Sequence, residues 1–492
     1  FANLKCFGQN LNSKNNHWQI HTSSAVDVNG MFAACPNFNA PITGGLVTVG
    51  SKTYEAWNMK AVRKMHHMFY NASYSIKGTA SFNQPIGDWN VSSSTHMGGM
   101  FQNHQTFNQD LSKWETTNVT NLSSMFRGSG MTYNLSSSYQ NPTTRPTPSE
   151  NNPYIAWDTS NVTNLYGIFG VSITGNGILF PGYNGDVTNW NTSNVTDMRG
   201  AFSGHIYATA SFNQDISTKP VIVAAGTPLQ KSYNAWDVSN VIQFGFQATN
   251  EQTYSPYRLG MFYNNQSFNQ NISNWQINTS SAVDVKMQGL FRDARAFNQP
   301  ISKSIVTVGS KTYEAWNTKR VQKLRNIFYG AHSFNQDISN WDTSGSIDNT
   351  RTFYQAKSFN QDISTWDTSK CTAFPEMFYG CPITYNLSSS YQSPSDGRGP
   401  YIAWDVHSGS NFSGMFFNYN GDNSNPNKGY NGDVTNWNTS NATNIIRMFA
   451  GLSATHTSSF NQDVSTKPVV VAAGTPLQKS YNAWDVSNVT NF

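Results

Sequence analysis

The sequence predicts an α/β solenoid of about fourteen coils, arranged as two tandem blocks of seven coils with inserted β-hairpins and loops. The first observation behind this prediction is a short period. All fourteen tryptophans of the 492-residue chain stand in one sequence context, and the shortest spacing between them is that from Trp89 to Trp114 and from Trp341 to Trp366. A fixed period of about 25 residues is typical of stacked repeats, which bury their apolar faces against one another.

A second, longer period divides the chain into two blocks. A segment of thirty residues that begins at Phe212 returns at Phe460 with two Ile-to-Val exchanges, and the phrase VTVGSKTYEAWN also occurs twice. We therefore predict a first seven-coil block over residues 1–244 and a second over residues 245–492, which continue as one solenoid.

Within a coil, the spacing of apolar residues predicts a short strand followed by a short helix. Thr159 lies two residues after Trp157, which is the period of a strand. Val162, Leu165 and Ile168 then follow at three-residue intervals, a spacing that favours a helix or a helical turn.

The phrase FNQDISNWDTS, at residues 334–344, recurs in altered forms along the chain. We expect its apolar residues to point into the stack in each coil. We expect its polar residues to bond backbone groups at the corners and to form amide ladders from coil to coil. The apolar set is Phe334, Ile338 and Trp341, and the polar set is Asn335, Gln336 and Asp337.

Several coils carry extra residues between this phrase and the tryptophan. Lys303–Ala315 and Thr218–Ala235 alternate apolar and polar residues about a glycine, which predicts β-hairpins. Ser136–Ala156 is rich in proline and predicts an irregular loop. All enter at one point of the coil, so we expect them to decorate one edge, which is where repeat proteins often make contacts.

The segments SFNQDISNWDTS and TNVTNLSSMFRGSG resemble the BspA-type surface repeats, also called the mycoplasma-type 26-residue surface repeat. The resemblance covers almost the whole chain. It implies a right-handed, leucine-rich-repeat-like α/β solenoid exposed at a cell or virion surface. Adhesion is the activity usually inferred for this family.

Composition excludes several classes of function. Charged residues are 12% of the chain and the net charge is +4 without a basic run, which does not suit a nucleic-acid binder. No apolar stretch is long enough for a transmembrane helix. Common catalytic motifs are absent, so we expect neither an enzyme nor a cofactor.

No metal site is expected either. His17 and His21 have the spacing of a ligand pair, but Asn274 and Asn278 replace them in the second block. The segment Asn418–Gly429 has oxygen ligands spaced somewhat like a calcium loop but lacks the closing glutamate.

Covalent modification is predicted at cysteine and asparagine. Cys6 and Cys35 precede the corner phrase in successive coils, which are spaced by about 5 Å, so we expect a disulfide between them. The sequence leaves open whether Cys371 and Cys381 pair. Candidate glycosylation sites are Asn71, Asn118, Asn161, Asn194, Asn438 and Asn488, although the repeat itself also demands these asparagines.

The leading functional interpretation is a non-catalytic extracellular structural or adhesive protein that forms a stiff rod or filament. Because the sequence stops partway through a coil and starts without a recognisable capping unit, we expect end-to-end self-association or continuation in a longer repeat chain. The alternative is a glycan- or receptor-binding module of a surface fibre, which would need a concave aromatic patch on the inserted segments, at residues such as Tyr54 and Tyr313. Ice binding by a threonine ladder ranks below both, because the NVTN column is interrupted.

Overall fold

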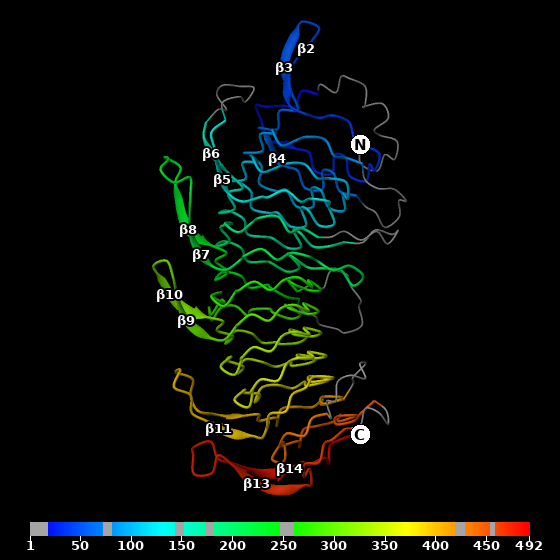
Figure 1. Ribbon diagram of the computed structural model, residues 1–492, viewed down its shortest axis with the longest axis vertical. Coiled ribbons are helices and arrows are strands. Elements are labelled where there is room, and N and C mark those ends of the chain that lie inside the picture. Colours follow the sequence, from blue (N-terminus) through cyan, green and yellow to red (C-terminus); the bar gives the residue numbers. More distant parts are fainter. Residues whose placement is uncertain are drawn as a thin grey trace. The chain divides into compact units, whose positions relative to one another are not determined.

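The computed structural model describes residues 18–71, 81–142, 152–172, 182–246, 260–418, 429–452 and 458–492. The chain divides into two compact units, and each is a stack of repeats (Figure 1). The first unit comprises Phe1–Val241, Tyr254–Gln270 and Val308–Lys311, and the second comprises Ile242–Thr253, Asn271–Thr307 and Thr312–Phe492.

Successive coils are joined by backbone hydrogen bonds and by single parallel bridges. In the first unit, one series of bridges runs through Lys64, His96, Asn121, Asn164 and Asp197. In the second unit, the equivalent series runs through Lys323, Asp348, Ala373, Asn411, Asn444 and Asn491.

The predicted helices are absent from the described residues, so the prediction of an α/β solenoid is wrong. Where a helix was expected, the amide of Ile168 donates to the carbonyl oxygen of Leu165 (3.2 Å), and that of Phe169 donates to Ala201 in the next coil (3.0 Å). A helix would bond its amides within itself. Gly167 also has a φ of +58°, which interrupts any right-handed helix. The three-residue interval therefore belongs to turns whose apolar side chains face inward.

The strands form two-stranded sheets rather than one continuous sheet. Strands β1 (Val26–Asp27) and β4 (Val62–Lys64) pair in parallel. The other sheets of the described residues join strands that follow one another in the sequence. These hairpins are β2 (Gly45–Val49) with β3 (Lys52–Ala56), β5 (Ser138–Gln140) with β6 (Tyr154–Ala156), β7 (Lys219–Val223) with β8 (Lys231–Ala235), β9 (Ser304–Val308) with β10 (Lys311–Ala315), β11 (Ser390–Gln392) with β12 (Tyr401–Ala403), and β13 (Lys467–Val471) with β14 (Lys479–Ala483).

The core of each unit contains columns of stacked aromatic rings. Phe328 and Phe353 stack with ring centroids 5.6 Å apart, and Phe353 and Phe378 repeat this distance. The indole nitrogen of Trp341 donates to the carbonyl oxygen of Ile301 in the preceding coil (2.8 Å). Phe334, Ile338 and Trp341 are fully buried, which confirms that the apolar residues of the recurring phrase form the core.

The polar residues of the same phrase form the predicted ladder. The side-chain oxygen of Asn335 accepts a hydrogen bond from the amide of Asn360 (2.9 Å), and the side chain of Gln361 donates to the carbonyl oxygen of Asn335 (3.0 Å). Asp337 accepts a hydrogen bond from the amide of Ser339 (2.8 Å) and so closes the corner. The prediction that these polar side chains are structural is confirmed.

The hairpins predicted over Thr218–Ala235 and Lys303–Ala315 are present as β7–β8 and β9–β10. The expectation of an irregular loop over Ser136–Ala156 needs correction, because its ends pair as β5 and β6 in antiparallel register. Residues 143–151 of that segment lie outside the described residues. None of the described segments is a helix of the length and apolarity needed to cross a membrane.

Tryptophans that follow a hairpin differ in backbone conformation from the others. Trp236, directly after β8, has a φ of +50°, and its amide donates to the carbonyl oxygen of Trp190 (3.0 Å). A positive φ is uncommon for a residue with a side chain, and here it lets the chain re-enter the coil from the hairpin. The same conformation occurs at Trp57, Trp157, Trp316, Trp404 and Trp484.

Candidate interaction surface

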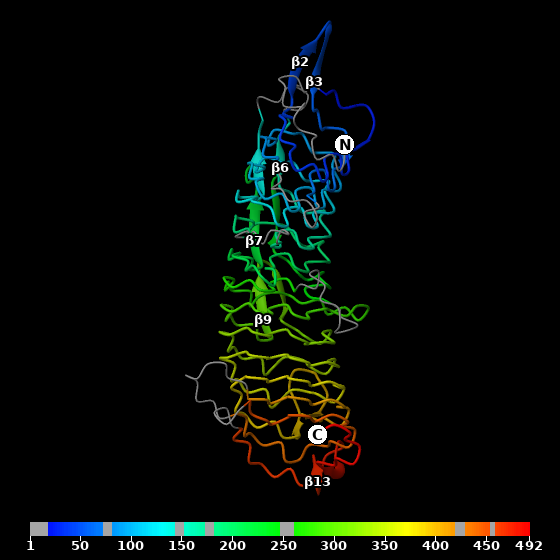
Figure 2. The same cartoon turned by 90° about the vertical axis from the view of Figure 1, so that its right-hand side faces the viewer.

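The second strand of each inserted hairpin ends directly before a tryptophan. In the first unit, β6 and β7 lie along the same side of the stack (Figures 1 and 2). In the hairpins that end in β6, β8, β10, β12 and β14, a tyrosine of the second strand bonds a backbone carbonyl of an earlier coil. The hydroxyl of Tyr233 donates to the carbonyl oxygen of Asn189, and that of Tyr481 donates to Asn436, both at 2.6 Å. Burial raises the pKa of both tyrosines to about 12, so they stay protonated donors.

The tyrosine of β10 takes part in the same arrangement. The hydroxyl of Tyr313 donates to the carbonyl oxygen of Asn274 (2.5 Å), and the side chain is buried. Tyr54 is half-buried. These two residues therefore do not provide the exposed aromatic patch that the glycan-binding alternative requires.

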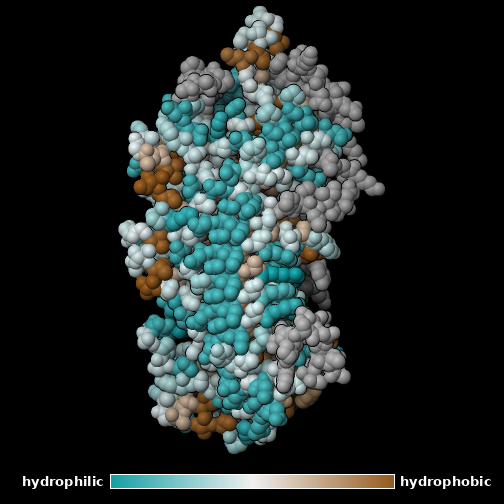
Figure 3. Space-filling view, viewed as in Figure 1, coloured by the Kyte–Doolittle hydropathy of each residue, from teal (hydrophilic) through white to brown (hydrophobic). Residues whose placement is uncertain are grey.

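Exposed apolar side chains gather on the hairpins instead. Each hairpin whose strands are five residues long exposes at least one large apolar side chain. In Figure 3, brown clusters mark two of these hairpins, β7–β8 and β9–β10. Contiguous exposed apolar surface on a protein often marks a contact site. The exposed fraction of the residue is between 55% and 72% at Leu46, Ile222, Ile305 and Val470.

An ion pair links several hairpins to an earlier part of the stack. In each case the lysine is the first residue of the second hairpin strand, and the aspartate directly follows the tryptophan of the preceding hairpin-bearing coil. We call this pair a hairpin clip. The pairs are Lys231 with Asp158 (2.5 Å), Lys311 with Asp237 (3.6 Å) and Lys479 with Asp405 (2.5 Å).

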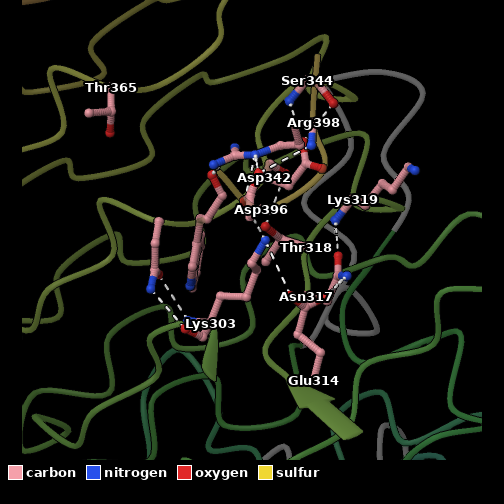
Figure 4. A network of polar contacts seen from close by, with 12 residues as sticks. Lys303, Glu314, Asn317, Thr318, Lys319, Asp342, Ser344, Thr365, Asp396 and Arg398 are labelled. Carbon is pink, nitrogen blue, oxygen red and sulfur yellow. Dashed lines mark hydrogen bonds and ion pairs between the residues drawn. The ribbon is translucent and has the colours of Figure 1, made fainter. Parts of the chain in front are cut away.

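The loop between β11 and β12 makes a related contact with the base of β9 (Figure 4). The ammonium group of Lys303 lies 2.6 Å from a carboxylate oxygen of Asp396 and 3.3 Å from one of Glu314. Arg398 donates to Asp396 (2.9 Å) and to the carbonyl oxygen of Trp341 (3.4 Å). Partial burial opposes ionisation of Asp396, but the hydrogen bonds from Lys303 and Arg398 outweigh it and lower its pKa.

The predicted disulfide is not tested by the structure, and the other two cysteines are not paired with each other. Cys6 lies outside the described residues, so its disulfide with the buried Cys35 stays a prediction. Cys371 and Cys381 are free thiols that donate to the carbonyl oxygens of Ala373 (3.3 Å) and Phe359 (3.4 Å). Burial raises the pKa of Cys371 to about 12 and also raises that of Cys381, which disfavours the reactive thiolate.

Four of the six candidate glycosylation asparagines use their side-chain amide nitrogens within the stack. The side chain of Asn161 donates to the carbonyl oxygen of Thr117, and that of Asn194 donates to Ser160, both at 2.7 Å. A glycan would be attached through the same nitrogen, so glycosylation would compete with these bonds. Asn118 and Asn488 make equivalent bonds, Asn438 accepts bonds from Ser440, and Asn71 is buried. Their glycosylation stays a prediction.

An exposed column of threonines lies beside the parallel bridges of the first unit. The hydroxyl of Thr120 donates to the carbonyl oxygen of Thr95, and that of Thr163 donates to Thr120, at 3.1 and 3.2 Å. Thr196 continues the series. In the second unit the column includes Ile347, as the interruption in the sequence predicts.

The residues considered as metal ligands do not come together where they are described. His21 bonds the hydroxyl of Ser24, while His17 and most of Asn418–Gly429 lie outside the described residues. Within the described ranges, no three His, Cys, Asp or Glu side chains stand close enough to hold one metal ion.

Comparison with known families identifies the repeat. The family model described as "Mycoplasma protein of unknown function, DUF285" matches six overlapping segments, at residues 1–75, 47–150, 134–258, 258–310, 304–392 and 384–473. The chain belongs to this family. The predicted resemblance to the mycoplasma-type repeat is confirmed, and the chain is a DUF285 repeat protein. No curated protein and no solved structure matches it.

Proposed function

We propose that this DUF285 protein is a non-catalytic repeat protein of the cell or virion surface, with a structural or adhesive role, and that the hairpins make its contacts. One observation carries the proposal. The polar residues of the repeat bond neighbouring coils, as Asn335 does, whereas the inserted hairpins expose apolar side chains such as Ile305. The repeat thus supports the stack, and the hairpins are left for recognition.

The recurrent aspartates support a non-catalytic role. A general acid or base must reach a substrate and usually has a perturbed environment. Asp110 and Asp362 instead accept hydrogen bonds from the amides of Ser112 and Ser364, both at 2.9 Å, in the manner of turn residues. The same contact recurs at Asp337.

Two measurements test the proposal. Cells or virions that carry the native protein are labelled with a membrane-impermeant reagent, and the protein should be labelled without lysis. Beads coated with the folded chain should then bind host or neighbouring cells through the hairpins. Labelling only after lysis would refute the surface location.

The bead assay needs a matched pair of variants. One carries Leu46→Ser, Ile222→Ser, Ile305→Ser and Val470→Ser on the hairpins, and it should lose binding while it keeps its circular dichroism spectrum. The control carries Ile347→Ser and Val464→Ser, two exposed apolar residues outside the hairpins, and should bind normally. Equal binding by both variants would exclude the hairpins as the adhesive surface.

The threonine column favours a second candidate, binding to a regular surface such as ice. Neighbouring strands are spaced by about 4.8 Å, so Thr95, Thr120 and Thr163 present hydroxyls at a regular interval. A Thr120→Tyr and Thr163→Tyr variant should then lose inhibition of ice recrystallisation. Wild-type protein that shows no such inhibition would eliminate this candidate.

A further inference from the structure

Two hairpin sequences each occur twice in the chain. The segment VTVGSKTYEA forms the tip and second strand at β2–β3 and again at β9–β10. The hairpins β7–β8 and β13–β14 also share their sequence, except that Ile222 is replaced by Val470. The chain therefore contains two copies of a hairpin tip and two copies of the hairpin that could receive it.

One tip contacts one receiving hairpin inside the first unit. A side chain added at Gly309, in the tip of β9–β10, would come within 3.4 Å of the side-chain oxygen of Asn234 and 3.8 Å of Pro220. The adjacent Lys311 makes its hairpin clip with Asp237. Val308, at the same tip, is only 7% exposed.

The second tip lies open. Val49, the counterpart of Val308, is 52% exposed, and a side chain added at Gly50 would meet nothing within 4 Å. The ammonium group of Lys52 bonds the side chain of Gln19 (2.8 Å) rather than an aspartate.

The second receiving hairpin is open as well. Asn482 is exposed, whereas its counterpart Asn234 is half-buried, and Pro468 is exposed like its counterpart Pro220. Asp485 follows Trp484 as Asp237 follows Trp236, and hydrogen bonds from Ser487 lower its pKa, so it is ionised at neutral pH. Within the described residues Asp485 has no ion pair with a lysine.

We propose that the β2–β3 tip of one copy of this chain docks on the β13–β14 hairpin of a second copy. The contact repeats the one between β9–β10 and β7–β8, with Lys52 of one copy bound to Asp485 of the other. It continues the series of hairpin clips with opposite charges and identical neighbouring sequence. The inference rests on the proposed function, because it takes the hairpins as the contact surface.

The geometry of this contact is head to tail. Each copy offers one tip and one receiving hairpin, and the two surfaces differ, so a docked pair still has one of each surface open. Heterologous contacts of this kind build rings or open chains of copies rather than a closed dimer. We therefore expect assemblies that grow with protein concentration.

Charge reversal tests the docking on the full chain by sedimentation velocity over a range of concentrations. Wild-type protein should increase in mass as concentration rises. Lys52→Glu and Asp485→Lys should each weaken self-association about tenfold or more, because like charges then face one another. A chain that carries both substitutions should recover the self-association, since opposite charges again meet between copies.

Lys311→Glu is the matched control, because it makes the same chemical change at the β9–β10 tip, which is already occupied by its contact with β7–β8. This variant should leave self-association unchanged. Wild-type protein that stays monomeric at its highest soluble concentration would overturn the docking proposal. A loss that is equal for Lys52→Glu and Lys311→Glu, or a double reversal without recovery, would also overturn it. A monomeric protein could still pass the surface-labelling and bead assays, so failure of the docking is distinguishable from failure of the proposed function.

Discussion

The hairpins β2–β3 and β9–β10 have the same sequence at their tips but different surroundings. Val308 is 7% exposed and directly precedes Gly309, which faces Asn234 and Pro220, whereas Val49 is 52% exposed. Lys311 pairs with Asp237, whereas Lys52 bonds Gln19. A tip's local sequence therefore determines its shape, while the hairpin that precedes it in the stack determines whether it is buried.

The largest effect is expected at the tryptophan that follows each of these two hairpins, because its surroundings are the same in both coils. Trp57 and Trp316 follow the two hairpins and are both buried, with their amides bonded to the tryptophan of the preceding coil. Trp57→Ala and Trp316→Ala should each lower the free energy of unfolding by about 3–5 kcal/mol, the range for truncation of a buried aromatic residue. Chemical denaturation measures both.

Equal losses of unfolding free energy in the two variants would show that the difference between the hairpins is confined to their tips. If Trp57→Ala were harmless while Trp316→Ala unfolded the protein, the coil of β2–β3 would not share the stacked core of the coil of β9–β10.

The next effect is the pH dependence of stability that a buried histidine of the first block causes. His104 is buried in the first unit at a position where the second block has Ala356, and burial lowers its pKa to about 4. Between about pH 6.5 and 4 the unfolded state binds a proton that the folded state does not, so stability falls as the pH falls. The slope should reach roughly 1.4 kcal/mol per pH unit.

His104→Ala, which copies the second block, removes this source of acid sensitivity, although it also opens a cavity. The test is therefore the change in melting temperature between pH 7 and pH 4.5 rather than the melting temperature itself. The variant should show a smaller change than wild type. An identical change would mean that His104 does not remain neutral in the folded state.

A smaller effect tests the tips directly. Val308→Ala should cost about 1 kcal/mol, because it removes buried methyl groups, whereas Val49→Ala should stay within about 0.5 kcal/mol at an exposed site. Both are measured in dilute protein, so that association does not cover Val49. A cost at Val49 equal to that at Val308 would contradict the difference in their surroundings.

Much of this arrangement could be predicted from the sequence, because the residues that form the core recur at the same positions of each repeat. The recurrence of Phe334, Ile338 and Trp341 identified buried positions, and alternation about Gly309 identified a hairpin. The helices were predicted wrongly because turns place apolar side chains at the same three-residue interval. What separates the two is where the amides bond, and Phe169 bonds a neighbouring coil.

The hairpin clips were missed for a different reason. Lys231 and Asp158 are far apart in the sequence, and they meet only because a hairpin spans the intervening coil. The available signal was the recurrence of a lysine at the start of the second hairpin strand and of an aspartate after the tryptophan, as at Lys479 and Asp405. Nothing in either motif alone indicates that the two form a pair.

The smallest expected effect belongs to the clip at the occupied tip. Lys311 is 45% exposed and lies 3.6 Å from Asp237, so solvent and salt weaken their attraction. A double-mutant cycle with Lys311→Met and Asp237→Asn should give a coupling energy of about 0.5 kcal/mol in low salt and less in high salt. Lys52→Met should cause no such salt-dependent loss in dilute protein, because Lys52 bonds the neutral side chain of Gln19 rather than a carboxylate. A coupling energy that ignores salt, or a loss at Lys52 equal to that at Lys311, would show that the clip is not the electrostatic contact that distinguishes the two tips.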